Sequence, residues 1–136
     1  MRAIYVTRHD LRRLVELVNV ARAFGREQER YLRLLEEELN RAHVVEPEDV
    51  PPDTITMNSK VLLRDRDTGS ETVYTLVFPA EADPARCKVS VLAPIGTAML
   101  GYRAGDVFEW QAPRGTRRLE VLDILYQPEA AGDLVL

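Results

Sequence analysis

Apolar residues in the first part of the chain recur three or four positions apart, which is the spacing of one face of an α-helix. The first such stretch contains Leu11, Leu14, Val15 and Val18. Thr7, followed three residues later by Asp10, resembles a capping box in which Asp replaces Glu. The pattern predicts a helix over residues 8–23, ended at Phe24-Gly25 because glycine readily takes the left-handed conformation that terminates helices.

A second apolar stripe follows at helical spacing and comprises Tyr31, Leu32, Leu35, Leu39 and Ala42, with charged residues at most other positions. Neither helix can bury its stripe alone, so the two are expected to pack as a short antiparallel hairpin, or coiled coil, within residues 1–45. A helix of sixteen residues extends only about 24 Å, because each residue adds 1.5 Å.

After residue 53 the period changes to that of β-structure. Residues 55–63 and 72–78 are β-rich runs on either side of the polar turn Asp65 to Gly69, which indicates a hairpin. A short strand is predicted over 88–92, a short helix over 95–100 opened by Pro94, and further strands over 107–110 and 117–126. The predicted class is α+β, with a mostly antiparallel sheet of about five strands curled over one short helix.

Charge divides the chain at the same place. Residues 1–45 carry a net charge of +2 and residues 46–136 a net charge of −6. The acidic, proline-rich segment 46–53 is expected to be a linker between the helical hairpin and a C-terminal domain over 54–136. The tail from Pro128 to Leu136 is expected to be flexible.

Composition excludes several functional classes. The net charge of −4 argues against a free-standing nucleic-acid binder and favours a protein partner. Cys87 is the only cysteine, so neither an internal disulfide nor a thiolate metal cluster is expected. No apolar run reaches the ~18 residues of a membrane span and the N-terminus does not resemble a signal peptide, so we expect a cytoplasmic protein that does not contact membranes.

Several motifs in the second region resemble the C-terminal domain of bacterial Gre transcript-cleavage factors. They are the run Thr56-Met57-Asn58-Ser59-Lys60-Val61, the turn Asp67-Thr68-Gly69, the block Glu81-Ala82-Asp83-Pro84, and Ser90-Val91-Leu92-Ala93-Pro94-Ile95-Gly96 with Leu100-Gly101 and Gly105-Asp106. The tail Tyr126-Gln127-Pro128-Glu129-Ala130-Ala131-Gly132-Asp133 and the short hairpin are similar to the Rnk-type regulators of nucleoside diphosphate kinase within that superfamily.

The resemblance implies a C-terminal domain like that of FK506-binding proteins (FKBP-like), which docks on RNA polymerase near its secondary channel with the hairpin pointing inward. In Gre factors, acids at the tip of a longer hairpin help to hold a catalytic Mg²⁺. The tip here offers Glu27 and Glu29 among arginines, on a shorter hairpin. We therefore expect a non-enzymatic regulator that competes with Gre-type factors and affects nucleoside diphosphate kinase indirectly. The alternatives are a transcript-cleavage factor and a direct binding partner of the kinase.

Two surfaces are candidates for the protein partner. The first is the segment around the short helix, with Pro94, Ile95, Gly96, Met99 and Leu100. The alternative for Met99 and Leu100 is that they fill the concave face of the sheet. The second surface is the tip, with Arg22, Phe24 and Arg26; Phe24 instead closes the hairpin in the alternative interpretation.

Other chemistry has little support in the sequence. His9 and His43 lack metal-ligand spacing, Cys87 has no histidine base nearby, and Asp65 and Asp67 are explained by the turn. Nine aromatic residues leave few for the groove of a prolyl isomerase. We expect a monomer without catalytic residues, metal or cofactor, and no glycine-rich phosphate loop is present.

Overall fold

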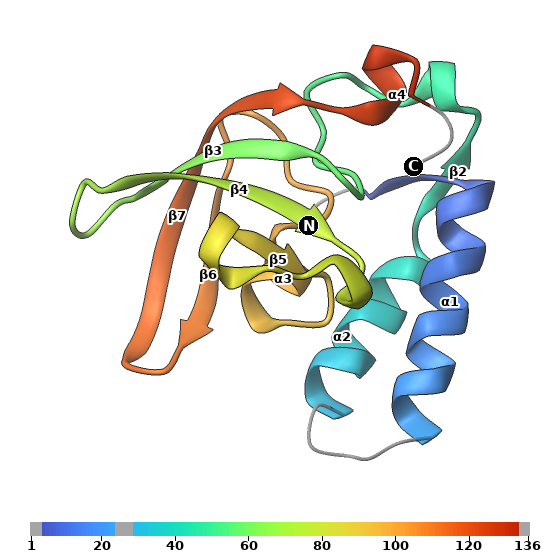
Figure 1. Ribbon diagram of the computed structural model, residues 1–136, viewed down its shortest axis with the longest axis horizontal. Helices are drawn as coiled ribbons and strands as arrows, with labels where there is room; N and C mark the ends of the chain where they lie inside the picture. The colour runs from blue at the N-terminus through green and yellow to red at the C-terminus, as the bar shows by residue number, and fades with distance from the viewer. Residues whose placement is uncertain (1–3, 24–28, 134–136) are drawn as a thin grey trace.

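The computed structural model describes residues 4–23 and 29–133 of the 136 in the chain. Figure 1 shows a helical hairpin packed beside a curled sheet, with the C-terminal helix α4 above the junction between them. The predicted α+β class is confirmed. No helix within the described ranges is both long and apolar enough to cross a membrane.

The hairpin consists of α1 (Arg8–Ala23) and α2 (Glu29–Asn40). The predicted start of the first helix is confirmed, and the helix continues to Ala23, where the first described range ends. Its cap forms because the N–H of Asp10 donates to Thr7 Oγ1 at 3.2 Å. Val15 is 44% exposed and lies outside the buried stripe. Two short strands that the periodicity did not reveal, β1 (Tyr5–Thr7) and β2 (His43–Val45), pair in parallel and join the open ends of the hairpin.

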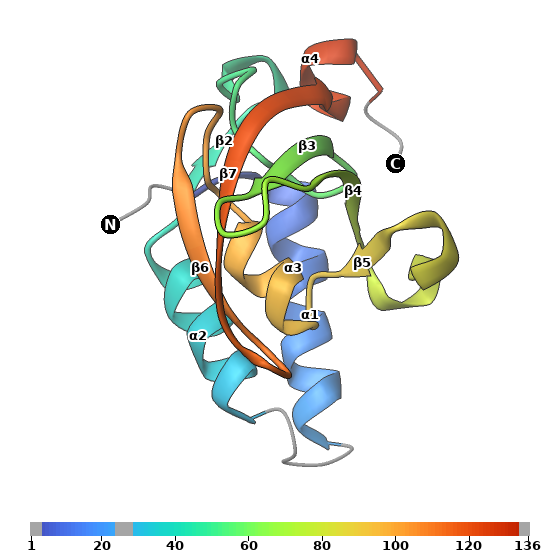
Figure 2. The ribbon, with the colours of Figure 1, turned by 90° about the vertical axis from the view of Figure 1, so that its left-hand side faces the viewer.

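The sheet has five strands in the order β5-β4-β3-β7-β6. Their bounds are β3 (Lys60–Asp65), β4 (Glu71–Val77), β5 (Lys88–Ser90), β6 (Val107–Ala112) and β7 (Gly115–Tyr126). All neighbours are antiparallel except β4 and β5, which pair in parallel. The helix α3 (Pro94–Met99) lies between the sheet and the hairpin (Figure 2). This agrees with the prediction of a sheet curled over one short helix.

The first predicted strand begins later than its β-rich composition indicated. Residues 55–59 are not part of the sheet, because Thr56 and Ser59 close a turn in which the Thr56 N–H donates to Ser59 Oγ at 3.0 Å. Asn58 within that turn has a φ of 67°, a left-handed conformation that Asn tolerates better than most residues.

One hydrophobic core joins the hairpin to the sheet. Leu14 and Leu35 of the hairpin belong to the same buried cluster as Met99 and Phe108. At Gly101, which has a φ of +88°, a Cβ atom would lie 2.4 Å from the Cγ1 atom of Ile4. Glycine suits this position because of its positive φ and because Ile4, the residue before β1, packs directly on the segment after α3.

The linker and the tail hold each other in place. The linker contains the 3₁₀ turn η1 (Pro47–Asp49), and the tail folds into α4 (Pro128–Ala131). The Gln127 side chain donates from Nε2 to the carbonyl oxygens of Pro51 at 2.8 Å and Thr54 at 2.6 Å. The expectation of a flexible tail is therefore wrong for residues 128–131, because they have specific partners.

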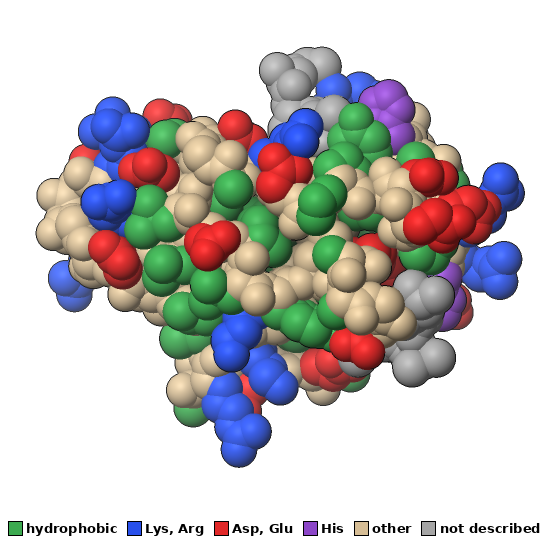
Figure 3. All heavy atoms as spheres, turned by 90° about the horizontal axis from the view of Figure 1, so that it is seen from above, with side chains coloured by type: hydrophobic (Ala, Val, Ile, Leu, Met, Phe, Trp, Pro, Cys, Tyr) green, Lys and Arg blue, Asp and Glu red, His purple; other side chains and the backbone are tan. Residues whose placement is uncertain are grey.

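Two further 3₁₀ turns, η2 (Pro79–Glu81) and η3 (Pro84–Arg86), connect β4 to β5. Cys87 ends the second of them with a φ of 55° and is a half-buried free thiol beside the short strand β5. Acidic and basic side chains are interspersed on the face seen in Figure 3.

Candidate partner-binding groove and hairpin tip

A groove opens on the concave face of the sheet, where its two hairpins and α3 meet. Its volume is ≈ 250 Å³. The apolar lining comprises Leu63, Tyr74, Ile95, Trp110, Ala112 and Leu119, and the polar rim comprises Asp65, Ser70, Thr72 and Arg117. Apolar side chains form the floor, whereas polar groups make up most of the exposed surface, so the groove offers a partner both apolar contact and hydrogen-bonding groups.

Strand alternation aims the side chains of β6 and β7 into the groove. Trp110 is paired with Arg117, and Phe108 is paired with Leu119, so all four lie on the same face of the antiparallel ladder. Arg118, one residue along β7, points to the opposite face because successive side chains alternate.

The floor of the groove depends on close packing of α3 against the end of β5. A Cβ atom at Gly96 would lie 1.9 Å from the carbonyl oxygen of Ser90, so only glycine permits this approach. Thr97 Oγ1 donates to the Val91 carbonyl oxygen at 2.6 Å and fixes the orientation of the helix. Ile95 is thereby presented to the groove at 8% exposure.

The rim carries an ion pair of defined geometry. Asp65 Oδ1 accepts the backbone N–H of Asp67 at 2.8 Å and of Thr68 at 3.2 Å, which confirms that this Asp serves the turn. The hydrogen bond from the Asp67 N–H, and to a lesser extent that from Thr68 and the charge of Arg117, hold the pKa of Asp65 below its ordinary value. Arg117 Nε lies 3.3 Å from Asp65 Oδ2, so the ionised carboxylate positions the guanidinium at the groove edge.

Comparison with known proteins decides the family. Residues 50–126 match the family described as "Transcription elongation factor, GreA/GreB, C-term", and residues 2–45 match "Rnk N-terminus". The chain belongs to the Rnk branch of the GreA/GreB family.

The "Regulator of nucleoside diphosphate kinase" of Escherichia coli K12 is 48% identical over 103 residues, which cover 75% of this chain and 76% of that protein. GreA of Clostridium botulinum strain Eklund 17B is 41% identical over 90 residues, which are 66% of this chain and only 56% of that GreA.

Solved structures show the same two-part fold. A GreA/GreB elongation factor from Nitrosomonas europaea superposes with a TM-score of 0.77 at 37% identity, covering 93% of this chain and all of that chain. Gfh1 of Thermus thermophilus, at 24% identity and a TM-score of 0.51, covers 92% of this chain and 100% of its own and shares the fold. The narrower expectation of an FKBP-like domain is compatible with this Rnk/Gre fold and stays a prediction.

The residues expected around α3 divide into surface and core. Pro94 is half-buried at the first turn, Ile95 lines the groove, and Gly96 permits the close packing. Met99 is 0% exposed and Leu100 is 2% exposed. Their side chains fill the core beneath the sheet, which is the alternative that the sequence left open, and they offer a partner no direct contact.

At the hairpin tip, Phe24, Arg26 and Glu27 lie outside the described residues. Arg22 is half-buried, with Nη1 at 2.7 Å from Glu36 Oε2 and Nε at 3.4 Å from a carboxylate oxygen of Glu29. The hydrogen bond to Glu36, followed by the charges of Glu29 and Glu36, raises the pKa of Arg22 above its ordinary value. Arg22 therefore links α1 to α2, and Glu29 is an ion-pair partner in this arrangement.

Sequence reasoning missed the groove residues Tyr74, Trp110 and Arg117, which were assigned to strands without a role. The available signal was the strict alternation along β6 and β7, with an aromatic and a cation at facing inward positions. Asp65 was identified only as a turn residue, and it also orients Arg117.

The described part of the chain holds no group of three His, Cys, Asp or Glu side chains that would suit a metal ion. His9 and His43 are both exposed. The His43 ring is stacked on Tyr5, with ring centroids 5.1 Å apart, so its visible role is to cover the β1–β2 pair.

Proposed function

We propose that this protein is a non-enzymatic regulator that binds RNA polymerase near its secondary channel and competes there with Gre-type factors. The observation that carries the proposal is the accessible groove of ≈ 250 Å³ on the concave face of a Gre-type sheet, with Trp110 on its apolar floor and Arg117 at its rim. The likeness to the Nitrosomonas europaea factor covers both parts of the chain, which supports a similar mode of docking. This function places the protein in the cytoplasm, and we expect it to act as a monomer.

The chemistry of the groove suits an apolar side chain of the partner flanked by a polar or acidic one. Trp110 is half-buried, and with Ile95 and Tyr74 it supplies apolar contact area. Arg117 is 41% exposed at the side chain although it pairs with Asp65, so its guanidinium retains donors for a partner carboxylate. Pro94 borders the same region and remains part of the proposed contact surface.

The hairpin supports regulation in place of transcript cleavage. The sixteen residues of α1 span only about 24 Å. Glu29 is drawn toward Arg22, whereas a shared Mg²⁺ site requires carboxylates that converge on one point. Arg22, Phe24 and Arg26 are proposed to contact the partner at the channel entrance, and Glu27 and Glu29 are assigned no catalytic role.

The test is competition on purified bacterial core RNA polymerase, with a labelled Gre factor as the displaced ligand and a backtracked complex to score cleavage. Arg117→Glu reverses a charge that faces the groove. Arg118→Glu is the matched control, because Arg118 also pairs with an aspartate of the same turn (Nη2 to Asp67 Oδ1, 3.2 Å) but lies on the other face of β7.

We expect the natural protein to displace the Gre factor without new cleavage products, Arg117→Glu to displace it at least about tenfold less well, and Arg118→Glu to resemble the natural protein. Equal loss in both variants contradicts docking through the groove. Cleavage that disappears in Glu29→Ala contradicts the non-enzymatic assignment.

A direct interaction with nucleoside diphosphate kinase is the second candidate, because the Escherichia coli relative is named as a regulator of that enzyme. It predicts that the purified kinase binds this protein, or changes its turnover, with polymerase absent. Failure of polymerase binding together with such an effect would replace the first proposal by the second.

A further inference from the structure

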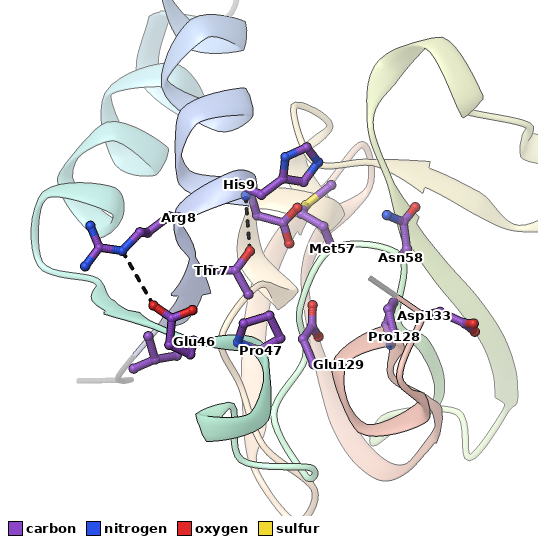
Figure 4. Close-up of a pocket in the computed structure, with 12 residues that line it drawn as sticks. Thr7, Arg8, His9, Glu46, Pro47, Met57, Asn58, Pro128, Glu129 and Asp133 are labelled. Atoms are coloured by element: carbon purple, nitrogen blue, oxygen red, sulfur yellow. Dashed lines mark hydrogen bonds and ion pairs between the residues drawn. The ribbon is translucent and has the colours of Figure 1, made fainter. Parts of the chain in front are cut away.

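A second pocket lies at the joint between the helical hairpin and the C-terminal domain, away from the groove. Its volume is ≈ 250 Å³, and its walls come from the first turn of α1, the end of β2, the turn before β3, and α4 (Figure 4). Residues more than a hundred positions apart in the sequence thus face the same space. In Figure 4 the Glu129 side chain points from α4 toward Met57 and the start of α1.

Four carboxylates line this joint pocket, and three of them have partners. Glu46 Oε1 lies 3.8 Å from Arg8 Nε at the exposed rim. Glu129 Oε1 accepts a hydrogen bond from the Thr56 hydroxyl, with 2.6 Å between the two oxygens. Asp133 accepts a hydrogen bond from the hydroxyl of Tyr126.

Asp10 is the exception. Asp10 as a whole is only 7% exposed. Within residues 4–23 and 29–133, no hydrogen bond or ion pair is made by its carboxylate. Burial first, and the charge of Glu129 second, raise the pKa of Asp10 to about 6, against the smaller opposing effects of His9 and Arg13. The oxygens of Asp10 are not among the described side-chain atoms that are buried without a partner, so the carboxylate opens on the pocket. A cationic donor placed there between Asp10 and Glu129 would be attracted by both charges.

The remaining walls indicate which kind of cation fits. Met57, Pro47 and Pro128 provide apolar surface, and Asn58 adds an amide oxygen. Since no group of three acidic or histidine side chains in the described ranges suits a metal ion, a hard divalent cation lacks its ligand set. An ammonium group needs only a few acceptors for its three N–H donors, and its methylene chain can lie on the apolar wall.

We propose that the joint pocket is a binding site for a primary alkylammonium group, with Asp10 and Glu129 as its two anionic acceptors. The group is carried either by a free aliphatic amine or by a lysine side chain of a partner. This site is separate from the groove and does not rest on the proposed polymerase binding.

Calorimetric titration of the full chain tests the proposal with three probes at equal ionic strength: 1,5-diaminopentane, Nα-acetyl-lysine-N-methylamide and MgCl₂. Asp10→Asn and Glu129→Gln remove one charge each while keeping the shape of the side chain. Asp123→Asn, an exposed carboxylate of β7 outside the joint pocket, is the matched control.

We expect one amine per chain, binding at least about tenfold weaker in Asp10→Asn and Glu129→Gln, and unchanged binding in Asp123→Asn. Near pH 6, where about half of the Asp10 carboxyls are protonated, each bound amine should release roughly half a proton to the buffer, and at pH 8 almost none. A purely structural role of Asp10 would not produce this proton release.

Binding of the diamine identifies a free amine as the source of the group, and binding of the lysine derivative alone identifies a partner's lysine. The proposal is overturned if neither amine binds, if Mg²⁺ binds as well as the amines, or if Asp10→Asn leaves affinity and proton release unchanged.

Discussion

Replacing Asp10 by Asn tests the electrostatics of the joint between hairpin and sheet. A carboxyl whose pKa is about 6 in the folded protein and 3.8 in the unfolded chain binds its proton more tightly when folded. Between these values the folded state holds more protons, so the stability that Asp10 contributes is fully present below pH 3.8 and is lost as the pH rises through 6.

The magnitude follows from linkage. Asp10 adds about 2 kcal/mol to the free energy of unfolding at pH 4.5, relative to an unshifted carboxyl, and almost nothing at pH 8. Asn stays neutral and lacks this dependence. The stability of Asp10→Asn minus that of the natural protein should therefore rise by about 2 kcal/mol from pH 4.5 to pH 8.

Urea unfolding followed by circular dichroism at half-unit pH intervals measures this difference, because titration of all other groups cancels between the two proteins. Glu129→Gln should reduce the pH dependence only in part, since the charge of Glu129 is the second cause after burial. A difference that stays constant within about 0.5 kcal/mol across the range would refute the reasoning, because it would mean that Asp10 is solvated in the folded protein.

Three further outcomes are expected. Gly96→Ala should lower the free energy of unfolding by about 2–4 kcal/mol, because the new Cβ would lie 1.9 Å from the Ser90 carbonyl oxygen. The control Ala98→Gly on the same helix should lower it by only about 1 kcal/mol. Equal melting temperatures of the two variants would contradict the close packing. Gln127→Ala should cost about 1–3 kcal/mol and accelerate amide exchange at Thr54, whose N–H donates to the Pro51 carbonyl oxygen, because the carbonyl oxygens of Pro51 and Thr54 each lose their hydrogen bond from Gln127; unchanged exchange would show that this segment is held by other contacts. Arg117→Glu should weaken displacement of a Gre factor from polymerase while Arg118→Glu does not, and the reverse order would place the contact surface on the outer face of β7.

Local sequence was sufficient for the elements whose signals are local. The first helix begins at the predicted residue because its cap and its apolar spacing agree. The turn at Asp65 is likewise set by its own side chain, which accepts two amide protons of the next residues. The motifs from Thr56 to Asp106 were enough to indicate the family that the comparisons show.

The candidate groove was predicted only at its floor. Pro94, Ile95 and Gly96 were identified from the helix-opening proline and the flanking glycines. Trp110 and Arg117 were missed because they become neighbours on one face of the sheet only through the pairing register of β6 and β7. Register depends on the turn and on burial across the sheet, so it cannot be derived from either strand alone.

By itself, the sequence determined the two-part α+β organisation, the faces of the helices and strands that turn inward, and the family. Periodicity carries that information because it records which face of an element is apolar. It does not record what covers that face.

Only the tertiary structure decided that Met99 and Leu100 are core, that β1 and β2 join the hairpin ends, and that α4 approaches the first turn of α1. The last of these isolates Asp10 beside Glu129, across a separation of more than a hundred residues. Such a charge environment arises from packing between distant segments, and no local pattern in the chain encodes it.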